Sequence, residues 1–170
     1  MDKRHIISIL VENKFGVLAR VAGLFSGRGY NIESLSVGVT NDPNYSIITV
    51  VTSGDENIIE QIVKQLRKLV NIIKVRDLTH LDHVEREMLF VKVKTTMKTR
   101  TDIFSIVNTF RAKIISLNSE SAIIEITGVK EKNLAFLEVL KPFEIIEVVR
   151  TGGIAMMRDP SITQELHKGV

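Results

Sequence analysis

The sequence predicts an α+β protein made of two tandem ferredoxin-like βαββαβ domains. Short apolar runs of strand length alternate with segments whose apolar residues recur at helical spacing. The order strand, helix, strand, strand, helix, strand occurs in residues 1–79 and again in residues 84–158. The chain has 170 residues, of which 44% are hydrophobic, so it can build two small domains with cores of their own.

The first half contains every element of that order. Residues 6–11 form an apolar run that suits a buried strand and is too short for a membrane helix. Apolar residues at helical spacing then begin at Val17 and stop before Gly27 and Gly29. Glycine is common just after the end of a helix, so the helix is predicted to end there. Residues 53–56, Ser-Gly-Asp-Glu, form a capping-box pattern before a second helix. The remaining strands of this half are predicted at 32–39, 46–52 and 72–78.

The second half repeats the architecture without repeating the residues. Its strands are predicted at 88–94, 114–117, 122–127 and 145–149. Thr101 and Asp102 are predicted to cap one helix, and a second helix over 131–140 is stopped by Pro142. Residues 80–83 are predicted to be a polar linker between the two domains, and residues 159–170 a tail.

Composition excludes several classes of function. Cysteine is absent, so there are no disulfides, no thiol chemistry and no cysteine-based metal site. The net charge of +3 comes from 23 basic and 20 acidic residues that are scattered, which favours solvated faces over nucleic-acid binding. No signal-peptide core and no long apolar run is present, so we expect a cytoplasmic protein without membrane contact.

Candidate metal and catalytic sites are weak. A polar cluster near the linker offers imidazole and carboxylate groups at His80, Asp82, His83 and Glu85. Its spacing matches no zinc pattern, so we predict no metal site there. His5 and His167 lie near the termini and are predicted to be solvated. Because neither a nucleophile elbow nor a phosphate-binding loop is present, the chain is expected to be a sensor without catalytic residues.

The most informative segment is the turn between the first strand and the first helix. Asn13 and Gly16 precede a helix N-terminus, where four N–H groups lack intrahelical partners and attract an anion. Gly16 can adopt a positive φ and lets a ligand approach the main chain. Asn31 follows at the start of the next strand. Either Asn13 only caps the helix, or this segment binds the carboxylate of a small ligand; the length of the pattern favours the second interpretation.

The strand after Asn31 also has a distinctive pattern. The small residues Ser34, Ser36 and Gly38 alternate with larger apolar residues, so one face of this strand admits the close approach of another surface. Each half alone would also be only marginally stable, because a unit of about 75 residues buries only about 60–65% of the surface of its unfolded chain. Both observations predict pairing with a second copy of the chain.

Several segments together carry a resemblance to a known family: 10–35, 42–43, 60–62, 65–70, 83–87 and 150–152. The first resembles the start of an ACT domain. Taken in order over about 150 residues, they resemble the small regulatory subunit of acetohydroxyacid (acetolactate) synthase. The first domain is accordingly expected to be an ACT domain that binds an effector.

The resemblance implies a regulatory subunit with no catalytic site and no cofactor of its own. It implies a separate catalytic large subunit that holds thiamine diphosphate, Mg and FAD. It further implies a role in branched-chain amino-acid biosynthesis, where the small subunit activates the large one and makes it sensitive to feedback inhibition by valine. ACT domains commonly pair, so a homodimer through the first domain is expected, with the effector at its seam.

The family's effector site maps onto Asn13, Lys14, Phe15, Gly16, Val17, Leu18, Asn31 and Ile32. The resemblance implies that N–H groups near Gly16 bind the effector's carboxylate. It implies that Asn13 and Asn31, from one protomer or from two, bind its ammonium or carboxylate group. Val17 and Ile32 are expected to meet its isopropyl group. Ala19 and Phe15 depart from some relatives, so leucine and isoleucine remain candidate effectors beside valine.

Two alternatives belong to other classes of function. Small-molecule modules of this plan often accompany DNA-binding domains, so a ligand-responsive transcription regulator is the first. Both halves are already used by the two domains, and no helix-turn-helix segment is left over. A free-standing enzyme is the second, and the lack of a catalytic constellation disfavours it.

Overall fold

The computed structural model describes residues 3–159 and 162–163, and it confirms the α+β class with two βαββαβ halves. The chain divides into two compact units. Of the described residues, the first contains those up to Val84 and those from Gly153 onward, and the second is Glu85–Gly152. Residues 153–158, assigned by the sequence to the second domain, therefore cluster with the first unit.

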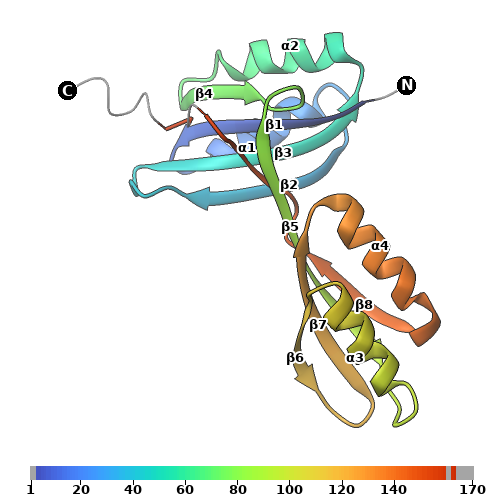
Figure 1. Cartoon of the computed structure of the whole chain (residues 1–170). Coiled ribbons are helices and arrows are strands. Elements are labelled where there is room, and N and C mark those ends of the chain that lie inside the picture. Colours follow the sequence, from blue (N-terminus) through green and yellow to red (C-terminus); the bar gives the residue numbers. More distant parts are fainter. Residues whose placement is uncertain (1–2, 160–161, 164–170) are drawn as a thin grey trace. The chain divides into compact units, whose positions relative to one another are not determined.

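The first unit is a four-stranded sheet with two helices on one face (Figure 1). Its strands lie in the order β2-β3-β1-β4, and all neighbours are antiparallel. The strands are β1 (Lys3–Glu12), β2 (Ile32–Val39), β3 (Tyr45–Gly54) and β4 (Ile72–Asp77). The helices are α1 (Val17–Ser26) and α2 (Glu56–Leu66). Every element predicted for this half is present, and the bounds of β2 match the prediction.

The core of the first unit lies between the sheet and the helices. Alternate residues of β1, among them Ile7 and Ile9, are fully buried against Phe25 of α1 and Leu66 of α2. Because side chains alternate across a strand, the residues between them point to the other face of the sheet. The apolar run of β1 is thus used on both faces.

The second helix starts differently from the prediction. The N-cap of α2 is Asp55, whose carboxylate accepts a hydrogen bond of 2.9 Å from the Asn57 N–H. The capping box required Ser53 as the cap and Glu56 in the first turn reaching back to it. Instead Ser53 belongs to β3, and Glu56 lies 3.1 Å from the imidazole of His80. An Asp two residues further on is an equally good cap, and the long β3 strand selects it.

The second unit has the same plan. Its strands lie in the order β6-β7-β5-β8, with α3 and α4 on one face (Figure 1). The strands are β5 (His83–Lys94), β6 (Lys113–Leu117), β7 (Ser121–Gly128) and β8 (Ile145–Arg150). The helices are α3 (Arg100–Thr109), α4 (Lys130–Leu140) and the short 3₁₀ turn η1 (Lys141–Phe143), which contains Pro142. An edge-to-face pair of Phe110 and Phe136, with centroids 5.3 Å apart, lies in its core region.

Two predictions for this half need correction. The N-cap of α3 is Thr99, so Thr101 and Asp102 lie inside the helix. Hydrogen bonds between Thr96 and Thr99 form the turn that leads into it. In addition, β5 begins at His83 and so includes the last residue of the predicted linker.

A short strand that the sequence did not predict, β9 (Ile154–Met157), crosses the open face of the first unit's sheet, opposite its helices (Figure 1). The Gly153 N–H lies 3.3 Å from the Ser34 hydroxyl oxygen, and the Arg158 N–H donates to the Asp82 carbonyl over 3.1 Å. Among the small residues of β2, Ser34 thus contacts another surface. That surface includes the chain's own C-terminal segment, whereas the sequence predicted only a second copy.

The prediction that His5 is solvated is wrong, because β1 begins at Lys3 and places His5 inside the unit. Its side chain is fully buried, with Nδ1 lying 3.5 Å from the Asp77 carboxylate and 3.4 Å from the Thr79 hydroxyl. His167 lies outside the described residues. No helix in the described part of the chain is long and apolar enough to cross a membrane.

The buried aromatic ring of α1 provides a test of the first core. Phe25 is fully buried, so Phe25→Ala removes a large core side chain and should lower the free energy of unfolding by about 3–5 kcal/mol. Val70 is 90% exposed, and Val70→Ala should change the same quantity by no more than about 0.5 kcal/mol. Denaturant unfolding of both variants measures the difference, and equal effects would contradict this core.

Candidate functional site

The turn between β1 and α1, residues 13–16, has the backbone geometry that the sequence predicted. Gly16 occupies the N-cap of α1 with φ of 79° and ψ of −5°, and no side chain caps the helix. A Cβ added at Gly16 would meet nothing within 4 Å, so the left-handed backbone, and not packing, requires glycine here. The first turn of α1 contains no acidic side chain, so the positive end of the helix dipole remains available to an anion.

Asn13 does not cap the helix. Its side-chain Nδ2 donates to the Pro43 carbonyl over 2.9 Å, and its backbone N–H donates to the Asn44 carbonyl over 2.7 Å. These bonds join the β1–α1 turn to the turn between β2 and β3. Capping, the alternative role considered for Asn13, is therefore absent in this structure.

The other side of the turn is fixed by Asn71, which lies just before β4. Its amide nitrogen donates to the Glu12 carboxylate, and its amide oxygen accepts a hydrogen bond of 2.6 Å from the Arg20 guanidinium. The Glu12 carboxylate also lies 3.0 Å from the Lys14 ammonium. Sequence reasoning missed Asn71 because nothing local connects it to residues more than fifty positions away. The network holds the start and the first turns of α1 in place.

These contacts lower the pKa of the Glu12 carboxyl below its usual value. The hydrogen bond from Asn71 is the largest cause, and the hydrogen bond and charge of Lys14 add to it. Both partners favour the ionised form. The negative charge of Glu12 is thus compensated next to a turn that would attract an anion.

The side chains that follow Asn13 point in different directions. Phe15 is fully exposed, and Leu18 is 41% exposed, so both are available to a ligand or a second surface. Val17 is only 4% exposed and packs in the core with Val21. The expectation that Val17 contacts the effector's isopropyl group therefore finds no support in the geometry of this turn.

Asn31 and Ile32 lie at the other end of the sheet. Both β1 and β2 are antiparallel to β3, so they run parallel to each other. The register pairs Ile32 with Thr52, and Thr52 with His5 at the start of β1. The span of β1 from His5 to its end is roughly 23 Å at about 3.3 Å per residue. Within one copy, Asn31 is therefore far from Asn13, and the structure does not bring these two groups together.

The polar cluster near the linker contacts other groups. His83 Nδ1 lies 2.7 Å from the Leu81 carbonyl oxygen, and the Asp82 carboxylate lies 3.2 Å from the Arg158 guanidinium. His80 pairs with Glu56 as described above. Across residues 3–159 and 162–163, no group of three or more His, Cys, Asp or Glu side chains is placed to hold a metal ion.

Comparison with known proteins identifies the family. A family model for the small subunit of acetolactate synthase matches residues 86–159, and an AHAS small subunit-like ACT domain matches residues 7–74. The acetolactate synthase small subunit of Aquifex aeolicus is 46% identical over 164 residues, which cover 96% of this chain and 85% of that protein. This chain belongs to the acetolactate synthase small-subunit family.

Members of this family from other organisms are similar over nearly the whole chain. The probable acetolactate synthase small subunit of Archaeoglobus fulgidus is 46% identical over 155 residues, which cover 91% of this chain and 97% of that protein. The crystal structure of the acetolactate synthase small subunit from Thermotoga maritima has a TM-score of 0.84 at 44% identity. That match covers 92% of this chain and 98% of the other. The chain is thus a regulatory small subunit by family, and the transcription-regulator alternative has no support.

The network around Glu12 predicts a pH-dependent contribution to the stability of this small subunit. Because the pKa of Glu12 is lowered on folding, its contribution is fully present above the unfolded-state pKa and is lost as the pH falls through the folded-state pKa. Asn71→Ala should raise the Glu12 pKa, and Lys14→Met should raise it less. An NMR titration of the Glu12 carboxyl carbon measures both shifts, and an unchanged pKa in Asn71→Ala would contradict this network.

Proposed function

We propose that this small subunit raises the activity of a catalytic large subunit of acetolactate synthase and makes it sensitive to valine. The partner is expected to carry thiamine diphosphate, Mg and FAD and to act in branched-chain amino-acid biosynthesis in the cytoplasm. This chain supplies the effector site and no catalytic group. Family membership supports the regulatory role and the large-subunit partner. The geometry of the β1–α1 turn supports the effector site.

The turn suits the carboxylate of an amino acid. The left-handed backbone of Gly16 directs the chain into α1 so that the first N–H groups of the helix lie together. The Val17 N–H has only a long bond of 3.4 Å, to the Lys14 carbonyl. A carboxylate that replaced this weak bond would gain charge-assisted hydrogen bonds and the favourable end of the helix dipole. The Lys14 ammonium pairs with the Glu12 carboxylate, so the nearby negative charge of Glu12 is compensated.

The ammonium and side chain of the effector need groups that one copy does not offer. Asn13 lies at the carboxyl end of β1, whereas Asn31 lies at the opposite end of the sheet, so one amino acid cannot contact both in a single copy. Strand β2 is an edge strand, so its free edge can pair with another strand. Antiparallel pairing of two β2 strands around a two-fold axis would carry the partner's β2 start, with its Asn31, to the end that holds Asn13.

A dimer of this kind also explains the exposed apolar groups at the turn. Phe15 is fully exposed and Leu18 is 41% exposed in the single chain. A second copy, together with the effector's alkyl group, would cover them. Ile32 of the partner, which is partly buried, remains the candidate contact for the isopropyl group, since Val17 is in the core. Leucine and isoleucine differ from valine by one methylene and would be discriminated by only about 1–3 kcal/mol.

Regulation requires that valine bind two arrangements of the subunits with different affinity. An effector held between two first units tightens their pairing, and the large subunit responds to that pairing. A coupling free energy of about 1–3 kcal/mol between effector and catalytic site would be ordinary for such a system. The dimer without effector then activates the large subunit, and the dimer with bound effector inhibits it.

Substitution at Gly16 tests this function in the reconstituted enzyme. Gly16→Asp and Gly16→Asn place similar side chains on the same left-handed backbone, which both residues tolerate better than most. Only the aspartate adds a negative charge, which should repel the effector's carboxylate. We expect Gly16→Asp to activate the large subunit and to lose inhibition by valine, with an increase of at least about tenfold in the valine concentration for half-inhibition.

Gly16→Asn is the matched control and should retain more inhibition than Gly16→Asp. Intact valine inhibition in Gly16→Asp would place the effector elsewhere. Failure of either variant to activate the large subunit would point to a folding defect, which thermal unfolding of the isolated chain would detect.

A further inference from the structure

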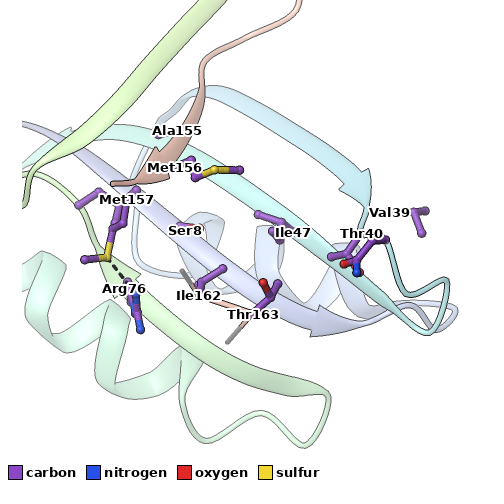
Figure 2. Close-up of a pocket in the computed structure, with 12 residues that line it drawn as sticks. Ser8, Val39, Thr40, Ile47, Arg76, Ala155, Met156, Met157, Ile162 and Thr163 are labelled. Atoms are coloured by element: carbon purple, nitrogen blue, oxygen red, sulfur yellow. Dashed lines mark hydrogen bonds between the residues drawn. The ribbon is translucent and has the colours of Figure 1, made fainter. Parts of the chain in front are cut away.

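A cavity lies on the open face of the first unit's sheet, opposite α1 and α2. Its volume is about 290 Å³, close to the lower end of the range for small-molecule pockets, about 300–1,000 Å³. Figure 2 shows that residues of β1, β3 and β4 form one wall and residues of β9 form the other. The N-terminus of α1, where the proposed effector site lies, is not part of it.

The sheet wall combines polar and apolar groups. Ser8 of β1 and Arg76 of β4 are direct partners in the strand ladder, so their side chains stand next to each other on the open face. Ile47 of β3 continues this wall with an aliphatic surface. Ser8 is only 4% exposed, so its side chain is largely shielded from bulk solvent.

The β9 wall is apolar and adaptable. Ala155, Met156 and Met157 face the cavity, and methionine side chains fill irregular spaces and adjust to different shapes. The Arg76 guanidinium donates to the Met157 sulfur over 3.0 Å (Figure 2). A thioether is a weak acceptor, whereas a guanidinium carries five donors that suit a carboxylate in a two-bond geometry. A carboxylate placed in the cavity would therefore form stronger bonds with this guanidinium than the thioether does.

The charge of the lining selects among carboxylates. None of the twelve described residues that line the cavity is acidic. The ammonium group of an amino acid would lose water there without meeting a carboxylate, which is costly in a partly buried site. A carboxylate that lacks the ammonium group avoids that cost. The aliphatic lining and the modest volume favour a short or branched alkyl body.

We propose that this cavity is a second ligand site, which binds a small aliphatic monocarboxylate without an ammonium group. The carboxylate bonds to Arg76 and Ser8, and the alkyl body packs against Ile47 and the β9 methionines. Because β9 forms one wall, an occupied site would hold the C-terminal segment on the sheet. This site is independent of the proposed effector turn.

Isovalerate, which has the carbon skeleton of valine without its ammonium group, is the probe. We expect sodium isovalerate to bind the full chain saturably in an NMR titration, with backbone shifts at Ser8, Arg76 and Met157. L-valine and isovaleramide, which respectively add the ammonium group and remove the negative charge, should not shift these signals. Equal shifts with L-valine would overturn the proposed selectivity.

Arg76→Met should weaken isovalerate binding by at least about tenfold. Lys74→Met is the matched control, because Lys74 lies on the same strand and face and its replacement removes the same charge, yet it does not line the cavity. It should leave the affinity within about twofold. Equal losses of isovalerate affinity in the two variants would mean that only surface charge matters, and this would overturn the proposed site.

Two further variants separate this proposal from folding defects and from the effector turn. Ala155→Leu adds bulk inside the cavity and leaves Arg76 unsubstituted. It should abolish the backbone shifts caused by isovalerate while the chain stays folded. Asn13→Ala should leave isovalerate binding unchanged whatever it does to valine binding. Retained binding in Ala155→Leu, or no binding of isovalerate to the unsubstituted chain at millimolar concentrations, would overturn the proposal.

Discussion

The strand order β2-β3-β1-β4 is the constraint on which the account of regulation depends. Because two antiparallel pairings separate β1 from β2, these strands run in the same direction. The end of β1 and the start of β2 then lie at opposite ends of the sheet. Two asparagines that resemble parts of one effector site are thus separated by the length of a strand. A site that contained both asparagines would therefore need two copies of the chain.

The same topology explains why the turn itself is held so firmly. The chain leaves β1 at Glu12 and enters α1 through the left-handed Gly16, and no side chain caps the first N–H groups of the helix. Bonds from Asn13 to the Pro43 carbonyl and from Asn71 to Glu12 fix this turn from two sides. A ligand that binds there meets a preorganised backbone, so little of its binding energy is lost in ordering the chain.

Much of this structure follows from patterns of local residues. The alternation of apolar runs predicts both βαββαβ halves, and the glycines after α1 and Pro142 after α4 stop the helices where expected. The turn with Asn13 and Gly16 was identifiable because its residue types serve one local geometry. Most of what the sequence missed depends on contacts between distant segments, whereas the Thr99 cap of α3 rests on a local turn with Thr96.

Four misses have this long-range cause. Burial of His5 depends on Asp77 and Thr79, and the anchoring of the turn depends on Asn71, all far away in the chain. Strand β9 is a run of four residues whose position depends on the open face of the first sheet. The choice of Asp55 over Ser53 as helix cap reflects the length of β3, which pairing with β1 determines. Local propensity does not contain this information.

A mixing experiment tests the central claim that the effector site is shared between two copies. Asn13→Ala and Asn31→Ala are each expected to lose binding of L-valine in calorimetric titration. When the two variants are mixed and allowed to exchange subunits, about half of the dimers contain one of each, and every mixed dimer has one intact site. About a quarter of the unsubstituted binding capacity should therefore return. The shared site would be contradicted by a mixture that does not bind L-valine, or by single variants that bind L-valine as well as the unsubstituted chain does.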